Sequence, residues 1–333
     1  MQGYQPFRRP SLTCGWPCDE LSPVEVVPQQ SAARLPLAPG VYRFRDQAGR
    51  VLYIGRAVSL RRRVRSYWGD LGDRRHLRVM VTRIARVEAV VCDSAHEAAW
   101  LERNLLQWRL PPWNRSHSGG QESEVWIRLS QSARAPGVTV VHQPMPGTDR
   151  HFGPYLGGQK VRDAVSGLSR VLPLAYTADG PAGSERDMAR VRGASPAGRP
   201  ALARTLTAVL DRDPAALASV RAELTARRAA AAATLAFEFA GRLQAELEAL
   251  DWVCGEQKVT VAADVDAADA DACGWADGIG VRFGIRGGRM CTWRQRPCGA
   301  AAARRYLDRT PPAWAGFAQR TAELAARLTS CAG

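Results

Sequence analysis

Residues 40–44 read Gly-Val-Tyr-Arg-Phe and residues 51–55 read Val-Leu-Tyr-Ile-Gly, and these two segments decide the fold of the surrounding region. Both are short runs of β-forming residues, and the segment between them, 46–49, supplies turn residues. Such a pattern predicts an antiparallel hairpin. Tyr42 and Tyr53 then lie on adjacent strands, each near a glycine.

The residues after the hairpin predict a compact α+β domain of about 80 residues. Ser59 is a suitable N-cap for a basic helix that runs towards Trp68. Four arginines belong to this helix: Arg61, Arg62, Arg63 and Arg65. Residues 87–92 have the composition of a third strand, and apolar residues at helical spacing predict a helix over 94–108.

The charge of the chain favours a polyanionic partner. The 46 Lys and Arg residues against 32 Asp and Glu give a formal net charge of +14, and the pI is about 10.1. Between Leu35 and Ser116 there are 16 arginines and 7 acidic residues, so +9 of that charge lies in a quarter of the chain. Since a GC-rich genome raises arginine use everywhere, this concentration points to nucleic acid.

Composition excludes several other classes of protein. Hydrophobic residues make up 46% and charged residues 23%, which is typical of a globular chain rather than a disordered or collagen-like one. No apolar run approaches the ~20 residues of a membrane helix, and residues 1–12 lack the apolar core of a signal peptide. We therefore expect a cytoplasmic, nucleoid-associated protein without membrane contact. The eight cysteines match no disulfide framework, and the pair Cys14 and Cys18 makes only a weak zinc hypothesis.

Each conspicuous polar residue has an ordinary explanation when taken singly. Tyr42 and Tyr53 are compatible with plain sheet aromatics, and the basic helix with a solvated face. Glu102 is compatible with a helix surface, and Asn114 with a loop turn. Together, however, these residues stand in one order: Gly-Val-Tyr at 40–42, Tyr-Ile-Gly at 53–55, Arg63, Glu102, and Asn114 twelve residues later.

This order resembles the GIY-YIG nuclease family, and most closely the N-terminal nuclease domain of UvrC proteins, the incision subunit of bacterial nucleotide excision repair. The resemblance continues through Phe-Gly-Pro-Tyr at 152–155 and through Leu235–Leu250, which is similar to the UVR helical hairpin that docks on UvrB. The implied fold class is α+β: a small GIY-YIG domain, with an antiparallel three-stranded sheet flanked by helices, is followed by smaller regions.

The chain is expected to divide into six parts. In order they are a linker or tail (1–34), the GIY-YIG domain (35–116), a UvrC-like connector (117–175), a linker or helical segment (176–212), a UVR-like hairpin (213–252) and a small β-containing C-terminal region (253–333).

The resemblance also implies roles for individual residues. Glu102 would hold a single divalent ion, Mg²⁺ or Mn²⁺, and Arg63 would neutralise charge on the scissile phosphate. Tyr42 and Tyr53 would orient or deprotonate the attacking water, with the choice of base left open. Asn114 would fix the active-site loop or approach the DNA backbone. DNA contacts fall to the neighbouring residues Gly55, Arg56, Arg61, Arg62 and Arg65.

Some segments depart from the UvrC pattern. The stretch from Leu172 onward has no cysteine for about 40 residues, so no iron–sulfur cluster is expected. The hairpin has Gln244-Ala245 and Arg227-Arg228 where the family carries other residues, so UvrB docking and a plain helical hairpin both stay open. The chain ends at Gly333, which predicts a stand-alone, Cho-like homologue without a second nuclease domain or helix-hairpin-helix tail.

The leading hypothesis is therefore a metal-dependent, structure- or damage-specific DNA endonuclease that makes one nick beside a lesion or a distorted structure, on the 3′ side as the resemblance implies. A non-catalytic module that binds DNA and recruits repair proteins is the alternative. A restriction or homing type of GIY-YIG enzyme is disfavoured, because the segments at 152–155 and 235–250 have no purpose there.

Overall fold

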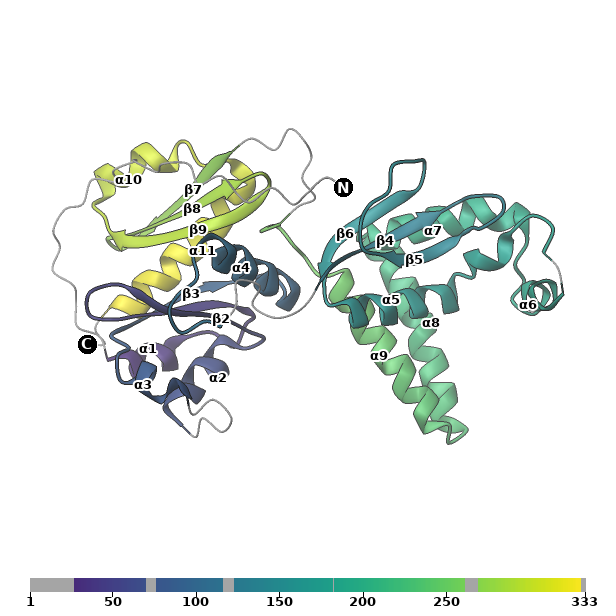
Figure 1. Ribbon diagram of the computed structural model, residues 1–333, viewed down its shortest axis with the longest axis horizontal. Coiled ribbons are helices and arrows are strands. Elements are labelled where there is room, and N and C mark those ends of the chain that lie inside the picture. Colours follow the sequence, from purple (N-terminus) through teal and green to yellow (C-terminus); the bar gives the residue numbers. More distant parts are fainter. Residues whose placement is uncertain (1–26, 70–75, 116–122, 182, 261–268, 331–333) are drawn as a thin grey trace.

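The computed structural model describes residues 27–69, 76–115, 123–181, 183–260 and 269–330, which form two lobes (Figure 1). The first lobe joins the N-terminal elements up to α4 with the C-terminal sheet and its helices. The second lobe contains the middle of the chain, from β4 to α9. None of the helices in these ranges is long and apolar enough to cross a membrane. Cys14 and Cys18 lie outside the described residues, and the five described cysteines are buried free thiols.

The first sheet confirms the predicted three-stranded antiparallel arrangement. Its strands are β1 (Gly40–Arg45), β2 (Val51–Ala57) and β3 (Arg86–Val91), in the order β2-β1-β3. Tyr42 pairs with Gly55 on one side and with Ala89 on the other. Strand β2 is therefore an edge strand, and its outer backbone groups need other partners.

Short helices cover one face of this sheet and a long helix covers the other. The first set is α1 (Pro28–Arg34), α2 (Leu60–Arg65), the 3-10 turn η1 (Ser66–Trp68) and α3 (Arg78–Val81). The long helix is α4 (Ala95–Trp108), whose N-cap Ser94 accepts a hydrogen bond of 3.0 Å from the Glu97 amide. Side chains alternate along β1, so Tyr42 and Phe44 face the short helices while Val41 and Arg43 face α4.

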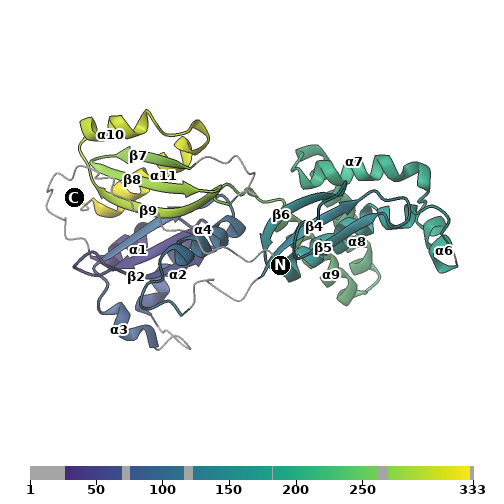
Figure 2. The same cartoon turned by 45° about the horizontal axis from the view of Figure 1, so that its top comes forward.

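The C-terminal region packs back onto the first sheet. Strands β7 (Ala270–Ala276), β8 (Ile279–Arg286) and β9 (Arg289–Pro297) form an antiparallel sheet. Helices α4 and α11 (Pro312–Thr329) lie between the two sheets, and α10 (Ala300–Leu307) covers the outer side, as Figures 1 and 2 show. One buried core therefore extends from the first sheet through both helices to the last sheet.

A buried arginine ties the two sheets of this lobe together. The Arg43 guanidinium lies 3.7 Å from the Trp293 ring centre and donates a 2.6 Å hydrogen bond to the Trp293 carbonyl. It also pairs with the buried Glu88, which Arg45 contacts at 2.9 Å. Burial alone would raise the pKa of Glu88, but the two guanidiniums hold it below its usual value.

The second lobe is a sheet backed by helices. The sheet has the order β5-β4-β6, with β4 (Glu124–Ser130), β5 (Gly137–Val141) and β6 (Arg150–Leu156). The helices are α5 (Gly158–Val171), α6 (Ser184–Val191), α7 (Arg199–Leu210), α8 (Pro214–Ala233) and α9 (Phe237–Val253), with 3-10 turns η3 (Leu174–Thr177) and η4 (Pro196–Gly198). Asp213 caps α8 as its sequence predicts, accepting from the Ala216 amide at 2.8 Å.

The middle of the chain can be compared with the regions expected from sequence. The Phe-Gly-Pro-Tyr segment lies in strand β6, and helix α5 follows it directly. Residues 176–212, expected to be a linker or a helical segment, contain α6 and α7 with the turn η4 between them. In the region after α9, Thr260 forms an isolated β-bridge with Arg289.

The contact between β7 and α11 gives a stability prediction. A Cβ on Gly274 would lie 2.2 Å from the Ala318 carbonyl oxygen, a backbone atom that cannot rotate away. Gly274→Ala should therefore force α11 off the sheet and lower the free energy of unfolding by about 1–3 kcal/mol. Gly241→Ala is the control, because a Cβ in that exposed position on α9 meets nothing and should stabilise the helix by up to about 1 kcal/mol. Urea unfolding measures both, and equal effects would contradict the packing described.

Candidate active site

Three tyrosines gather on the face of the first sheet that the short helices cover. Tyr42 and Tyr53 come from adjacent strands, and Tyr67 comes from η1. The hydroxyl oxygens of Tyr42 and Tyr67 lie 2.8 Å apart, and the Tyr42–Tyr53 and Tyr53–Tyr67 ring centres are 6.2 Å and 6.1 Å apart. Tyr42 and Tyr67 are buried, whereas Tyr53 is partly exposed. Tyr53 is therefore the member of the cluster that reaches solvent.

Gly55 makes room for two of these rings. A Cβ at this position would lie 2.6 Å from the Tyr42 hydroxyl oxygen and 2.8 Å from Cε1 of Tyr53. The glycine stands opposite Tyr42 in the strand register, so the phenol lies over bare backbone. A glycine is therefore needed at position 55, because any side chain there would collide with the rings of Tyr42 and Tyr53.

Burial keeps the two strand tyrosines in their neutral form. Desolvation raises the pKa of Tyr42 well above its usual value, and the nearby Tyr67 and Tyr53 add to the shift, while Arg63 opposes it. Desolvation likewise raises the pKa of Tyr53, with contributions from Tyr67 and Glu102. At neutral pH both phenols are therefore hydrogen-bonding groups rather than ready bases.

Arg63 is the arginine of α2 that turns towards the tyrosines. Its guanidinium carbon lies 5.8 Å from the centre of the Tyr67 ring, one helical turn further along the chain. Its Nε is buried and has no hydrogen-bond partner among the described residues. A buried cationic donor without a partner is suited to an anionic ligand that would complete it.

Glu102 reaches the outer edge of β2 from the other side of the sheet. Its Oε1 accepts a 3.2 Å hydrogen bond from the Arg56 amide, and its Oε2 lies 3.5 Å from Nε of Arg56. The side chain is only 8% exposed, and its charge acts on the Tyr53 phenol. One carboxylate thus stands at the rim of the tyrosine cluster, held by strand backbone and an arginine.

Asn114 completes the same edge of β2. Its Oδ1 accepts from the Ile54 amide at 3.0 Å and its Nδ2 donates to the Ile54 carbonyl at 2.8 Å. The side chain thereby replaces a neighbouring strand for the residue between Tyr53 and Gly55. In this geometry Asn114 braces the strand that carries the site.

Asn114→Ala should therefore loosen β2 as well as lower activity. Two buried backbone groups of Ile54 lose their partners, which costs about 1–3 kcal/mol of unfolding free energy. Arg115→Ala, at the exposed neighbouring position, is the control and should change stability little. A urea titration in which both variants unfold together would contradict the bracing role.

The oxygen ligands at this edge of β2 fit a hydrated divalent ion. No group of three or more His, Cys, Asp or Glu side chains that could hold a metal occurs among the described residues. A divalent ion here would rest on the Glu102 carboxylate, with water and substrate phosphate as further ligands, and Mg²⁺ is commonly bound in this way. The site therefore fits a hydrated Mg²⁺ or Mn²⁺ and does not fit a structural zinc.

The four arginines predicted to contact DNA lie in three different surroundings. Arg62 and Arg65 are exposed on α2, where they can meet phosphates. Arg61 is only partly exposed and donates a 2.5 Å hydrogen bond from Nε to the Leu35 carbonyl, so it anchors the segment between α1 and β1. Arg56 stands apart from them, beside Glu102.

Sequence reasoning missed Tyr67. It follows Arg63 by four residues, which places the two on one face of a continued helix. That spacing was the available signal, although the hydroxyl contact with Tyr42 depends on how α2 packs on the sheet.

Comparisons with known proteins find similarity to UvrC proteins. Residues 38–115 match the family model of the UvrC-like GIY-YIG domain. The UvrABC system protein C of Geobacter metallireducens is 36% identical over 143 residues, which are 43% of this chain and 23% of that protein. The protein of the same name from Moorella thermoacetica is 31% identical over 286 residues, 79% of this chain and 44% of that protein. This chain thus spans less than half the length of these relatives.

Among solved structures, one match is the GIY-YIG N-terminal endonuclease domain of UvrC from Thermotoga maritima bound to magnesium as its catalytic divalent cation. It is 30% identical and covers 26% of this chain and 93% of that domain, with a TM-score of 0.24.

Proposed function

The chain carries a GIY-YIG nuclease domain of the UvrC type, and from this premise we propose that the protein is a metal-dependent DNA endonuclease of nucleotide excision repair. It hydrolyses one phosphodiester bond beside a lesion, on the lesion's 3′ side. The observation that carries the proposal is the tyrosine cluster with the Arg63 guanidinium against it and the Glu102 carboxylate on the edge of the neighbouring strand β2. A protein that only binds phosphates has no use for a carboxylate in so basic a place.

Each residue of the site has a task in this reaction. Arg63 binds the scissile phosphate and stabilises the charge that grows on its oxygens as water attacks. Tyr53 holds the attacking water by a hydrogen bond, and Tyr42 and Tyr67 fix the orientation of that phenol. Glu102 would hold Mg²⁺ or Mn²⁺, which when bound supplies charge neutralisation at the phosphate.

The reaction is tested with a duplex that carries a single lesion and a label at either end of the damaged strand. We expect one metal-dependent nick, on the 3′ side of the lesion. A nick on the 5′ side alone would contradict the proposed side of cutting but would still support a nuclease. Tight, salt-sensitive binding without any nick would instead favour the recruiting module.

We also propose a protein partner at the tip of the α8–α9 hairpin, and the name of the relatives suggests UvrB. Most of the apolar stripe of α9 is used inside the lobe, where Leu243 and Leu250 are buried. Leu235 and Phe237, at the turn between the helices, are 73% and 65% exposed. Such a pair of exposed apolar side chains is suited to docking.

The proposed substrate also implies a location. A protein that cuts chromosomal DNA would lie with the chromosome in the cytoplasm.

Phe237→Ser should abolish any stimulation of nicking by UvrB and leave the basal rate unchanged. Phe237 is exposed and begins α9, and the turn between α8 and α9 is the end of the hairpin that points away from the first lobe (Figure 1). The fold should therefore tolerate the change. Nicking rates with and without UvrB measure the effect, with Glu238→Gln as the neighbouring control. Full stimulation of Phe237→Ser would exclude docking at the tip.

A further inference from the structure

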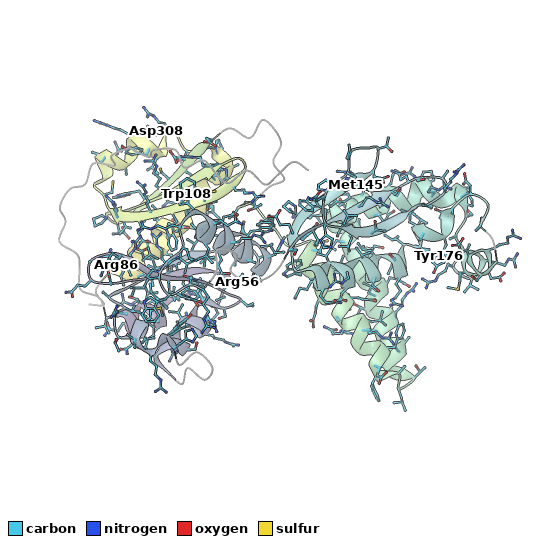
Figure 3. All side chains as sticks on the ribbon, in the orientation of Figure 1. Arg56, Arg86, Trp108, Met145, Tyr176 and Asp308 are labelled. Carbon is cyan, nitrogen blue, oxygen red and sulfur yellow. The ribbon has the colours of Figure 1, made fainter. Side chains whose placement is uncertain are left out.

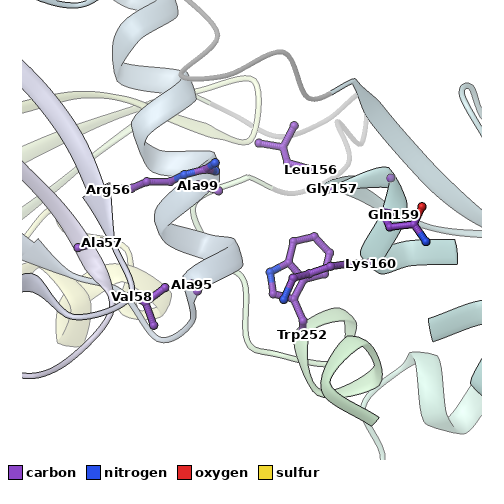
Figure 4. Close-up of a pocket in the computed structure, with 11 residues that line it drawn as sticks. Arg56, Ala57, Val58, Ala95, Ala99, Leu156, Gly157, Gln159, Lys160 and Trp252 are labelled. Carbon is purple, nitrogen blue, oxygen red and sulfur yellow. The ribbon is translucent and has the colours of Figure 1, made fainter. Parts of the chain in front are cut away.

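A cavity of about 530 Å³ lies where the two lobes meet (Figure 4). One wall comes from the end of β2 and the start of α4, through Arg56, Val58 and Ala95. The other comes from the segment directly after Phe-Gly-Pro-Tyr, through Gly157 and Lys160, and from Trp252 at the end of α9. Ligand pockets of small organic molecules have volumes in this range.

The polar groups of this cavity favour an anion. Arg56 and Lys160 enter from opposite lobes, and none of the described residues that line it is acidic. Figure 4 shows Lys160 beside the Trp252 ring, and its Nζ lies 5.9 Å from the ring centre. Lys160 is exposed, so its ammonium can reach a phosphate without disturbing the core. Two cations and an aromatic face are the groups that bind single nucleotides of a strand.

The aromatic wall is held in place by buried neighbours. The Trp252 ring centre lies 4.3 Å from that of His96, which accepts hydrogen bonds from Nε1 of Trp100 at 3.1 Å and from the Leu156 amide at 3.3 Å. Burial lowers the pKa of His96 to about 3, so the imidazole stays neutral. Trp252 also packs against Gly157, where a Cβ would lie 3.1 Å from Cη2 of the indole. The wall is thus preformed.

Arg56 connects the cavity with the nuclease site. It lies on the side of the first lobe that faces the second (Figure 3). Its amide and its Nε contact the two oxygens of Glu102 at 3.2 Å and 3.5 Å. A strand whose scissile phosphate meets Glu102 and Arg63 therefore has its next nucleotides beside this cavity.

On the basis of the nuclease function above, we propose that the cavity takes one unstacked nucleotide of the strand that is cut. Its phosphate lies between Arg56 and Lys160, and its base lies against Trp252. A stacked base pair with both backbones is too large for this volume, so an intact duplex must open locally before it binds there. Opening costs least at a damaged or unpaired position. Because only locally opened DNA can place a nucleotide in the cavity, the enzyme should bind distorted DNA in preference to an intact duplex.

The chain allows a well-matched test, because Lys160 and Lys258 are its two lysines. Binding is measured in the Glu102→Gln background, where no cutting is needed, on a duplex with a short unpaired bubble and on the same duplex fully paired. Lys160→Gln should lower the salt slope for the bubble by about 1 and reduce the preference for it over the paired duplex. Lys258→Gln, which also removes one charge, should change neither, since Lys258 lies outside the cavity and near Asp93 and Glu256.

Trp252 gives a second, independent readout. Trp252→Ala should weaken bubble binding by roughly 5- to 150-fold, the range found when a stacking aromatic is removed, and Trp252→Phe should restore most of it. Fully paired DNA should be bound nearly as well by all variants. Equal losses for Lys160→Gln and Lys258→Gln, or equal losses for both kinds of DNA, would overturn the assignment. If the wild type binds bubbles in this way but never nicks them, the proposed nuclease function is wrong, whereas the proposed nucleotide site in the cavity still stands.

Discussion

Glu102→Gln should lower the nicking rate by about 10³-fold while DNA binding survives. The glutamine keeps the size of the side chain, and its carbonyl oxygen can still accept from the Arg56 amide, so β2 should keep its edge. The variant loses the negative charge that a divalent ion needs. Single-turnover nicking with Mg²⁺, beside a binding titration, measures both effects.

Glu102→Asp separates the charge from its position. It keeps a carboxylate but withdraws it by one methylene, so an intermediate rate is expected. Glu256→Gln is the control, because this glutamate is 67% exposed and lies away from the site. A Glu102→Gln enzyme that cuts at the wild-type rate would show that the metal assignment is wrong.

Arg63→Ala should lower the nicking rate at saturating DNA by about 10²–10³-fold. Among the described arginines of α2, only Arg63 has its guanidinium against one of the tyrosines. Its buried Nε has no hydrogen-bond acceptor among the described residues. Its loss removes a donor aimed at the phosphate where charge develops. The affinity for DNA should change much less than the rate.

Arg62→Ala is the matched control on the same helix. Arg62 is exposed and would contact phosphates only from the surface, so its loss should lower the salt slope of binding by about 1 and leave the saturated rate nearly unchanged. A pair of variants that lose rate and affinity in parallel would contradict the distinction between the two arginines. Salt-dependent binding and single-turnover rates together decide it.

Local patterns were sufficient for the elements that carry the site. The alternation and turn at 40–55 predicted β1 and β2, and the apolar spacing over 94–108 predicted α4. Both signals are short-range, so no tertiary contact was needed to read them. The family resemblance then placed Tyr42, Tyr53, Arg63, Glu102 and Asn114 in one order, although their individual roles remain predictions.

The elements that sequence missed are those that packing decides. Strand β6 contains Gly153 and Pro154, which have low strand propensity, yet it pairs with β4 along most of its length. Strand β7 contains three alanines and a glycine, and Gly274 is needed there because α11 approaches so closely. Their strand character comes from neighbours far away in the chain.

The same limit applies to the site. Tyr67 meets Tyr42 only because α2 packs on the sheet, and Arg56 and Lys160 line one cavity only because two lobes approach one another. The spacing of Arg63 and Tyr67 does not show the contact with Tyr42, and no sequence pattern shows the shared cavity. Both required the three-dimensional structure.

The most direct test is a single-turnover nicking time course on a duplex with one lesion, for the wild type and for Glu102→Gln. The account predicts nicking by the wild type with Mg²⁺, its loss on chelation with EDTA, its return when Mg²⁺ is restored, and none of this in Glu102→Gln. Equal DNA binding by both proteins would show that the site is intact. A wild-type protein that binds the duplex and leaves it uncut with either Mg²⁺ or Mn²⁺ would contradict the central claim.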